Sequence, residues 1–545
     1  MHAHIETIRK TRSRQGLFGV LVFGWTGTIV AAMAAIVVSF FLFGYWYPYW
    51  RRADMDFMMV YQGFLLNDGR PQDFFDHPGH LNVLLTDVWF RLLHGIGALK
   101  VIALSDIPPA ADRVNFELVW TAAVRAGRLL SLVLVLCFVG VFAALLRRLV
   151  ADWRIAALGI LMLALSSAVM WHARVIRTDL LAAGLEFAGL LLLLEAARSP
   201  DWRWRPAVVG IAVMLCTLGV VNKVQAILLA LAWTVVAMFF GVRGDNAGSS
   251  WHSPRRAIVP IALLAAAALL TAIPAADLIR LGLVERPTSL FPFPPPPFGI
   301  VGLYQAMVAA WVVAAILAFA AIWRVPPLET IATLLAAFIG VCTGLLALDI
   351  RYHPQNVLSV VNPIEHMMAW ASFSDPQLAT GDGVFSSRLF QSLVFGIADV
   401  FARFTFVLHF STRATVFLQW LVCAGMVMAW RRGERLLVGQ VGILLAAAWG
   451  LDAVGTLRDL HIEYAIYADP LVVIAACWLL ANFSAPASHR LAFPLGALLL
   501  TINAVFGQFE PIKQGLRRAG PESTCSWLPR HIRLVERFPF CPPKT

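Results

Sequence analysis

Long apolar runs recur along the whole chain and are separated by short polar segments. Most runs hold roughly 17–25 residues, the number that a helix needs to cross the hydrocarbon core of a bilayer. The pattern therefore predicts an all-α polytopic membrane protein with about thirteen transmembrane helices. The expected spans are residues 17–45, 122–146, 155–170, 180–197, 207–221, 224–242, 258–275, 301–323, 328–348, 404–430, 436–451, 468–482 and 491–507.

The composition agrees with this interpretation. Hydrophobic residues make up 59% of the 545 residues, and charged residues only 14%. So few charged side chains cannot cover the surface of an ordinary soluble domain of this size. In a soluble protein the net charge of +11 would suggest nucleic-acid binding. Here most basic residues lie in short loops between spans, where they indicate which loops face the cytoplasm. We therefore expect no nucleic-acid partner.

The basic residues also set the expected orientation. The first span ends in the aromatic segment 45–50, as is typical of the far membrane interface, so residues 48–120 form an external loop. By the same count, residues 276–300 and 349–403 are external loops, and the tail 508–545 is external. Four basic residues precede the first span and should remain in the cytoplasm, namely Arg9, Lys10, Arg12 and Arg14.

The first external loop begins with an acidic stretch, residues 54–80, which holds five aspartates and two histidines. Residues 57–66 have the apolar spacing of a helix. On these residues alone, Asp54 or Asp56 caps an interfacial helix that is followed by a polar loop. Residues 81–98 are apolar but interrupted by the ionisable side chains of Asp87, Arg91 and His94, which indicates a second helix lying on the membrane.

Ionisable residues collect on the external side of this topology. Charges next to hydrocarbon are costly, so their collection at one membrane face indicates a functional site. The alternative for each residue taken alone is a charge that lines a solvated face. The residues are Asp54, Asp56, Asp76, His77, Arg125, Arg128, Arg177, Asp179, Lys223, Arg351, His353, His461, Glu463 and Asp469.

The acidic stretch resembles the first external loop of the GT-C glycosyltransferases. The similar branch is the bacterial one that includes protein O-mannosyltransferase-like enzymes and lipid A aminoarabinose transferases. There an acidic pair opens the loop and a glycine follows the first acid by fifteen residues, which is the spacing from Asp54 to Gly69. Met55 stands where the glutamate of the pair is usual, and Asp56 follows. The segment FDHPG at 75–79 resembles the family's acid–His–Pro motif, with glycine in place of the second proline.

Four further segments carry the resemblance, which covers most of residues 15–240 and is thin beyond them. RLLS at 128–131 is similar to the R-L-x-S that opens the second span. The turn 172–179 resembles an external loop in which an arginine precedes an acid. GVVNK at 219–223 is similar to G-L-x-x-x-T-K, with asparagine where threonine is usual. HIEYAIYADP at 461–470 looks like the family's R-Y-L-L-P segment, with histidine and glutamate in place of the usual arginine.

The resemblance implies an enzyme of the cell envelope, an inverting hexosyl- or pentosyltransferase in the bacterial inner membrane. Its donor would be a polyprenyl-phosphate-linked sugar, and its acceptor a hydroxyl of a lipid, glycan or protein at the periplasmic face. It also implies a GT-C-type transmembrane module in residues 1–240, with a variable transmembrane module in residues 241–507.

Such chemistry requires a base for the acceptor hydroxyl and positive charge for the departing phosphate. The resemblance makes Asp54 the expected catalytic base, with Asp56 as the second candidate. The phosphate-binding candidates are Arg128, Arg177 and Lys223. Further site candidates are Asp76, His77, Asp179, His461 and Tyr464, of which Asp76, His77 and Asp179 are also the candidate ligands if a divalent cation takes part. Helix capping is the alternative role of Asp179.

Two other function classes stay open. A transporter or flippase for a lipid or amphiphile should place charges near the membrane midplane on broken helices, and often shows a two-fold repeat. We find neither pattern in the sequence. A lipid-carrier-dependent polysaccharide ligase shares the donor class and is harder to separate from a transferase.

The C-terminal tail carries the last prediction. If it is external, Cys525 and Cys541 face an oxidising compartment and should pair. The alternative is a cytoplasmic basic tail with two reduced thiols, held to anionic lipid by its Lys and Arg side chains.

Overall fold

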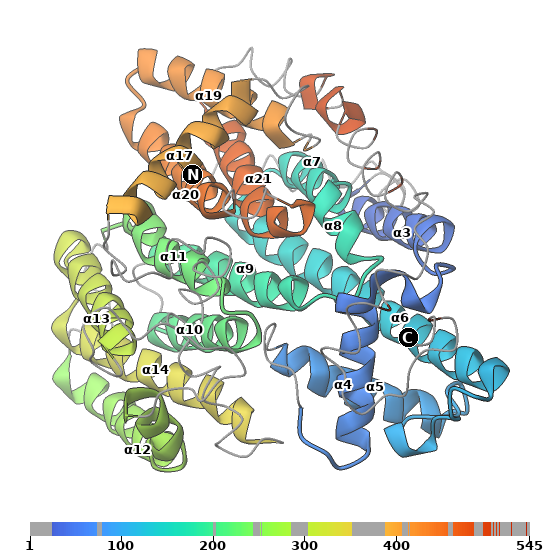
Figure 1. The fold of residues 1–545 in the computed structure, drawn as a ribbon. Helices are drawn as coiled ribbons and strands as arrows, with labels where there is room; N and C mark the ends of the chain where they lie inside the picture. The colour runs from blue at the N-terminus through green and yellow to red at the C-terminus, as the bar shows by residue number, and fades with distance from the viewer. Residues whose placement is uncertain are drawn as a thin grey trace.

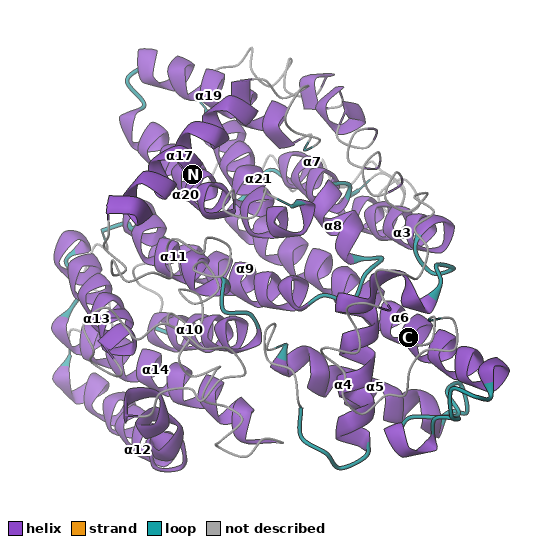
Figure 2. Ribbon diagram, in the orientation of Figure 1, coloured by secondary structure: helices purple, strands orange, loops and turns teal. Residues whose placement is uncertain are grey.

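The computed structural model describes residues 24–72, 79–199, 203–243, 251, 253–284, 303–350, 387–405, 413, 415–455, 461–483, 494–496, 498–502, 505, 508, 512, 525 and 541. Within these residues every regular element is a helix (Figure 2). In this part of the chain nine helices are long and apolar enough to cross a membrane, and three shorter apolar helices accompany them. The fold is therefore that of an all-α polytopic membrane protein, as predicted. The count of about thirteen spans stays a prediction.

The long apolar helices are α3 (Trp25–Phe43), α6 (Arg113–Leu149), α9 (Thr178–Ala197), α10 (Arg205–Asn222), α12 (Pro254–Val284), α13 (Leu303–Trp323), α14 (Pro327–Leu346), α20 (Arg435–Gly455) and α21 (Ala465–Asn482). The shorter ones are α7 (Trp153–Ala164), α11 (Ala226–Phe240) and α19 (Thr415–Arg431). The remaining α-helices are α4 (Met58–Asn67), α5 (His80–Gly95), α8 (Ser167–His172) and α17 (Ser387–Thr405), all shown in Figure 1.

Helix α21 lies at the centre of the main core. Every side chain from Ala465 to Leu479 is buried, and the helix packs against α7, α19 and α20. A helix that is apolar on all sides is stable only when neighbours surround it. Its place between those helices is visible in Figure 1.

Helices α10, α12 and α14 form a second group. Small residues bring α10 and α14 close together, because a Cβ atom at Gly340 would collide with the carbonyl oxygen of Gly210. Close backbone approach through small residues is a usual way for helices to associate in membranes. At the N-terminal ends of these two helices, Arg205 Nε donates to Glu329 Oε1 at 2.5 Å, and both side chains are buried.

The first loop has a hydrophobic core of its own, formed by α4, α5 and the N-terminal part of α6. Phe57 stacks on Trp120 with ring centroids 4.0 Å apart. The side chains of Leu85, Val88 and Leu92 on α5 are exposed. An apolar face left open on a short amphipathic helix is typical of helices that lie on a membrane surface, and this placement of residues 81–98 stays a prediction.

Three predicted spans differ from the observed helices. Helix α6 begins at Arg113 and not near 122, because Asp112 caps it by accepting from the backbone N–H of Asn115. The third span is divided near Leu165, where Ser166 caps a new helix. The tenth span begins at Thr415, and residues 387–405 form the separate amphipathic helix α17.

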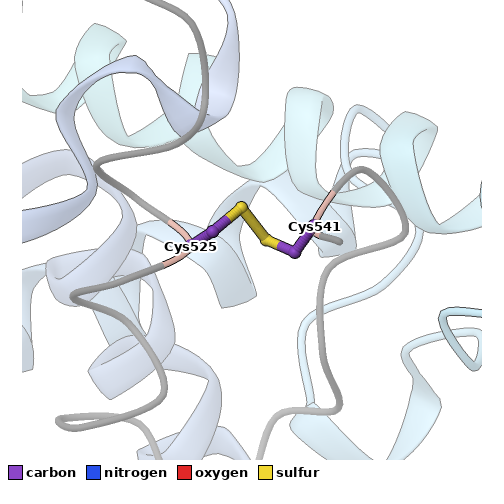
Figure 3. Close-up of a disulfide and its surroundings, with 2 residues drawn as sticks. All are labelled: Cys525 and Cys541. Carbon is purple, nitrogen blue, oxygen red and sulfur yellow. A yellow bond between two sulfur atoms is a disulfide. The ribbon is translucent and has the colours of Figure 1, made fainter. Parts of the chain in front are cut away.

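The C-terminal tail returns to the first loop. Cys525 and Cys541 form the expected disulfide, with Cα atoms 5.5 Å apart (Figure 3). Cys541 packs against the core of the first loop. Gln508 Oε1 accepts a hydrogen bond from Arg174 Nη2 at 2.7 Å. The tail and the first loop therefore lie at the same end of the helices, and they share whichever side of the membrane that end faces.

Candidate functional site

The first loop begins with a single π-helical turn, Ala53–Phe57, which carries Asp54 and Asp56. Turns of this kind are rare and occur often at functional sites. Asp56 is fully buried and accepts from Nε and Nη2 of Arg128 on α6, at 2.8 and 2.7 Å. A buried carboxylate requires such a partner, because an isolated charge in this environment is very costly.

Arg128 and Asp56 together connect three segments. Arg128 also donates to the carbonyl oxygens of Tyr47 and Pro48, at 2.7 and 3.2 Å. The second carboxylate oxygen of Asp56 accepts from the backbone N–H of Ile176 at 2.8 Å. The pair therefore fixes the π-helical turn against the segment that leads into α9. Its contacts indicate a positioning role for both side chains.

Next to Ile176 begins a cluster of two cations and two carboxylates. Arg177 donates from Nε to Asp179 Oδ2 at 3.0 Å and from Nη1 to Glu463 Oε1 at 3.3 Å. The Nζ atom of Lys223 lies 3.8 Å from Asp179 Oδ1. Arg177, Asp179 and Lys223 are 7%, 0% and 1% exposed, whereas Glu463 is 15% exposed. Three predicted site residues from two helices and their flanking loops thus meet in one buried group.

Asn222 fastens this cluster to the neighbouring helices. It donates from Nδ2 to Asn82 Oδ1 at 3.0 Å and to the carbonyl oxygen of Thr178 at 2.8 Å. Its own carbonyl oxygen accepts from the N–H of Gly79 at 2.9 Å, where φ is +56°. That left-handed conformation favours glycine. Asn222 therefore joins α5, α9 and α10.

His172 is a buried neighbour that the sequence prediction did not single out. Its Nδ1 atom lies 2.8 Å from the carbonyl oxygen of Ala168. Burial lowers the pKa of His172 to about 4, although the nearby charge of Asp179 favours protonation. The ring is therefore neutral at neutral pH, and it adds no positive charge to the cluster.

Glu186 on α9 was also missed. It is fully buried, about 12 Å along the helix from Thr178 at a rise of about 1.5 Å per residue. The hydroxyl of Tyr467 on α21 is close enough to the carboxyl groups of Glu186 and Asp179 to interact with both electrostatically. An acid inside an apolar span is a signal that sequence inspection can use, because such residues are rare and usually functional.

The remaining sequence candidates fall into two groups. Asp76 and His77 lie outside the described residues, and for Asp54 only the backbone is described. His461 and Tyr464 flank Glu463, which reaches the cluster; His461 is exposed and Tyr464 is partly buried.

Candidate metal ligands do not gather in the part of the chain that the structure describes: no three His, Cys, Asp or Glu side chains there are placed to hold an ion. Asp179 directs its oxygens at Arg177 and Lys223. The proposed ligands Asp76 and His77 are outside that part, so a divalent cation stays a prediction.

Comparison with protein-family models, with curated proteins and with solved structures finds no match for this chain.

Proposed function

We propose that the protein is an inverting glycosyltransferase that moves a sugar from a polyprenyl-phosphate donor to an acceptor hydroxyl at the external membrane face. One observation carries the proposal. The Asp56–Ile176 hydrogen bond, at 2.8 Å, joins the turn that contains Asp54 to the residue immediately before Arg177. A candidate base and a candidate phosphate-binding cation thus belong to two segments that are held directly against each other.

Asp54 is the base in this proposal, and Asp56 is not. Both oxygens of Asp56 already accept hydrogen bonds, and its side chain is fully buried. Asp54 takes the proton of the acceptor hydroxyl while that oxygen bonds to the anomeric carbon. The bond from this carbon to the phosphate oxygen breaks, and polyprenyl phosphate leaves.

Arg177 and Lys223 stabilise the negative charge of the departing phosphate. Glu463 holds Arg177 by the longer contact, 3.3 Å, and is the more exposed of its two carboxylate partners. An arriving phosphate therefore exchanges with Glu463, while Asp179 continues to orient the guanidinium. Arg128 has no part in this step, because its donors are directed at Asp56 and two carbonyl oxygens.

Glu186 favours a second candidate, a flippase or transporter for a lipid. A carboxyl group buried within a span is typical of proton-coupled transport proteins. In that case the Arg177 cluster would receive a headgroup and not a reacting phosphate.

A transfer assay tests the main proposal. The purified full-length protein is reconstituted in liposomes with a panel of polyprenyl-phosphate sugars, and mass spectrometry follows loss of donor and gain of polyprenyl phosphate. Mass spectrometry of envelope glycolipids and glycans, with and without the gene, identifies the acceptor to add. We expect turnover with a lipid-linked sugar and none with nucleotide sugars. Movement of lipid between leaflets without cleavage would support the flippase instead.

A further inference from the structure

A cavity of about 200 Å³ lies between α7, α19, α21 and the helical residues near 498. It is separate from the Arg177 cluster. Its walls come from most of α7 and α19, from the second half of α21, and from the residues near 498. Representative lining residues are Leu158, Leu421, Ala424, Val473, Leu480 and Leu499.

The lining is apolar throughout apart from the thiol of Cys477, which is directed at the carbonyl oxygen of Ile155 at 3.6 Å. A water molecule needs only about 10–15 Å³ in this measure, but it also needs two to four polar partners. The cavity has room for many waters and offers them almost no hydrogen bonds. Its chemistry suits a hydrocarbon chain.

The cavity lies towards the end of the bundle opposite the candidate site. Helix α7 begins directly after the basic end of α6, at Arg147 and Arg148. The Arg177 cluster includes Glu463, just before the start of α21, whereas the cavity reaches Phe483, just beyond the end of α21. The excess of basic residues assigns the cavity's end to the cytoplasmic leaflet.

Two arginines belong to segments that end or begin at this end of the cavity. The Cζ atom of Arg432 lies 4.8 Å from the ring centroid of Phe483, which lines the cavity. Arg154 is exposed and directly precedes the lining residue Ile155 in the sequence, at the start of α7. An apolar slot with two cations at its edge is complementary to an amphiphile with an anionic head.

We propose that the cavity binds an anionic glycerophospholipid of the cytoplasmic leaflet. One acyl chain fills the slot between α7, α19 and α21, and the headgroup phosphate pairs with Arg154 and Arg432. The sugar donor is a poor occupant, because its phosphate has to reach the Arg177 cluster at the opposite end of the helices.

The test uses the purified full-length protein in a mild detergent and native mass spectrometry. Phosphatidylglycerol and phosphatidylcholine with identical acyl chains are titrated separately. We expect phosphatidylglycerol to bind at least about tenfold more tightly, because its headgroup has a net negative charge, whereas the choline cation of phosphatidylcholine offsets the charge of the same phosphate. Arg154→Gln and Arg432→Gln should each reduce that preference several-fold. Arg203→Gln, an exposed arginine at the same end of the bundle, should leave it unchanged.

A second variant tests the slot itself. Ala424 is exposed to the cavity side of α19, so Ala424→Trp should fill the space and abolish retention of both lipids. Ala310→Trp, at an exposed position on α13 away from the cavity, should not. Equal binding of the two phospholipids, or wild-type preference in both arginine variants, would overturn the proposal. So would displacement of phosphatidylglycerol by equimolar polyprenyl phosphate, which would assign the slot to the donor. If Ala424→Trp fails to fold, the comparison of the two phospholipids and the two arginine variants still test the proposal.

Discussion

Arg128 and Asp56 form an ion pair in which both side chains are 0% exposed, 72 residues apart in the chain and 2.7 Å apart in space. A buried pair of this kind does not by itself add much net stability, because desolvation offsets the attraction. Breaking it is a different matter, because one charge is then left buried without its partner.

Removing one member of this pair should therefore be strongly destabilising. We expect Asp56→Asn to lower the free energy of unfolding by about 3–5 kcal/mol, observed as a large drop in the thermal unfolding temperature in detergent. Asp56→Leu combined with Arg128→Met should recover only part of the loss, because no buried charge remains but the N–H of Ile176 and the carbonyl oxygens of Tyr47 and Pro48 lose their partners. Arg113→Gln, which breaks an exposed pair with Glu117, is the control and should have little effect. A mild effect of Asp56→Asn would contradict the positioning role.

Asp54 should behave in the opposite way. Asp54→Asn keeps the shape of the side chain but removes its basicity, so folding should be preserved and transfer to the acceptor lost. The reconstituted assay measures this, with Asp106→Asn, an exposed residue of the first loop, as the matched control. Near-normal turnover by Asp54→Asn would end its assignment as the base.

Arg177 and Lys223 should govern use of the donor. Loss of a charge-assisted contact costs about 1.5–3 kcal/mol, which corresponds to a roughly ten- to hundredfold decrease in kcat/KM for the lipid-linked sugar. We expect this for Lys223→Met and for Arg177→Gln. Glu463→Gln should instead retain donor use, because it removes only the partner with which the phosphate exchanges. Unaltered donor kinetics in both cation variants would exclude the role.

The buried His172 predicts a pH dependence of stability. Burial holds its pKa at about 4, below the ordinary value of 6.5. The unfolded chain therefore binds an extra proton between these values, and stability present above pH 6.5 is lost as the pH falls towards 4. The contribution is on the order of 3 kcal/mol. Thermal unfolding at several pH values should show a shallower decline for His172→Gln, whereas His94→Gln, an exposed residue, should follow the wild type. Identical slopes in all three proteins would refute this.

The disulfide provides a topological test. The Cys525–Cys541 bond requires an oxidising compartment, and closing a loop of this size is worth about 3 kcal/mol in the chain-entropy model. A membrane-impermeant thiol reagent should label intact cells at these positions only after mild reduction. The five other cysteines are replaced by alanine for this experiment. Labelling that requires lysis and no reductant would place the tail in the cytoplasm.

The sequence was most informative where a local pattern decides the structure. Apolar length predicted most of the spans, and the interrupted pattern of residues 81–98 predicted the short helix α5. The pairing of Asp56 with Arg128 was not accessible, because it joins side chains far apart in the chain, and a cap or a base is an equally good interpretation of the same residue. Glu463 shows the same limit: no spacing rule connects it to Arg177, 286 positions earlier.

The length of α6 has a consequence for the acceptor. Its 37 residues form a rod of about 55 Å, whereas the hydrocarbon layer is only about 30 Å thick. If Arg148 lies at the cytoplasmic boundary, as the sequence predicts, Arg128 is about 30 Å farther along the helix, close to the opposite boundary. The rod therefore fixes the working height of the proposed catalytic turn, just where lipid headgroups begin. A hydroxyl carried on a membrane lipid arrives at that height unaided. A hydroxyl on a soluble polymer has to be brought to the membrane surface before it can react. The position of the turn therefore favours small acceptors that are anchored in the membrane.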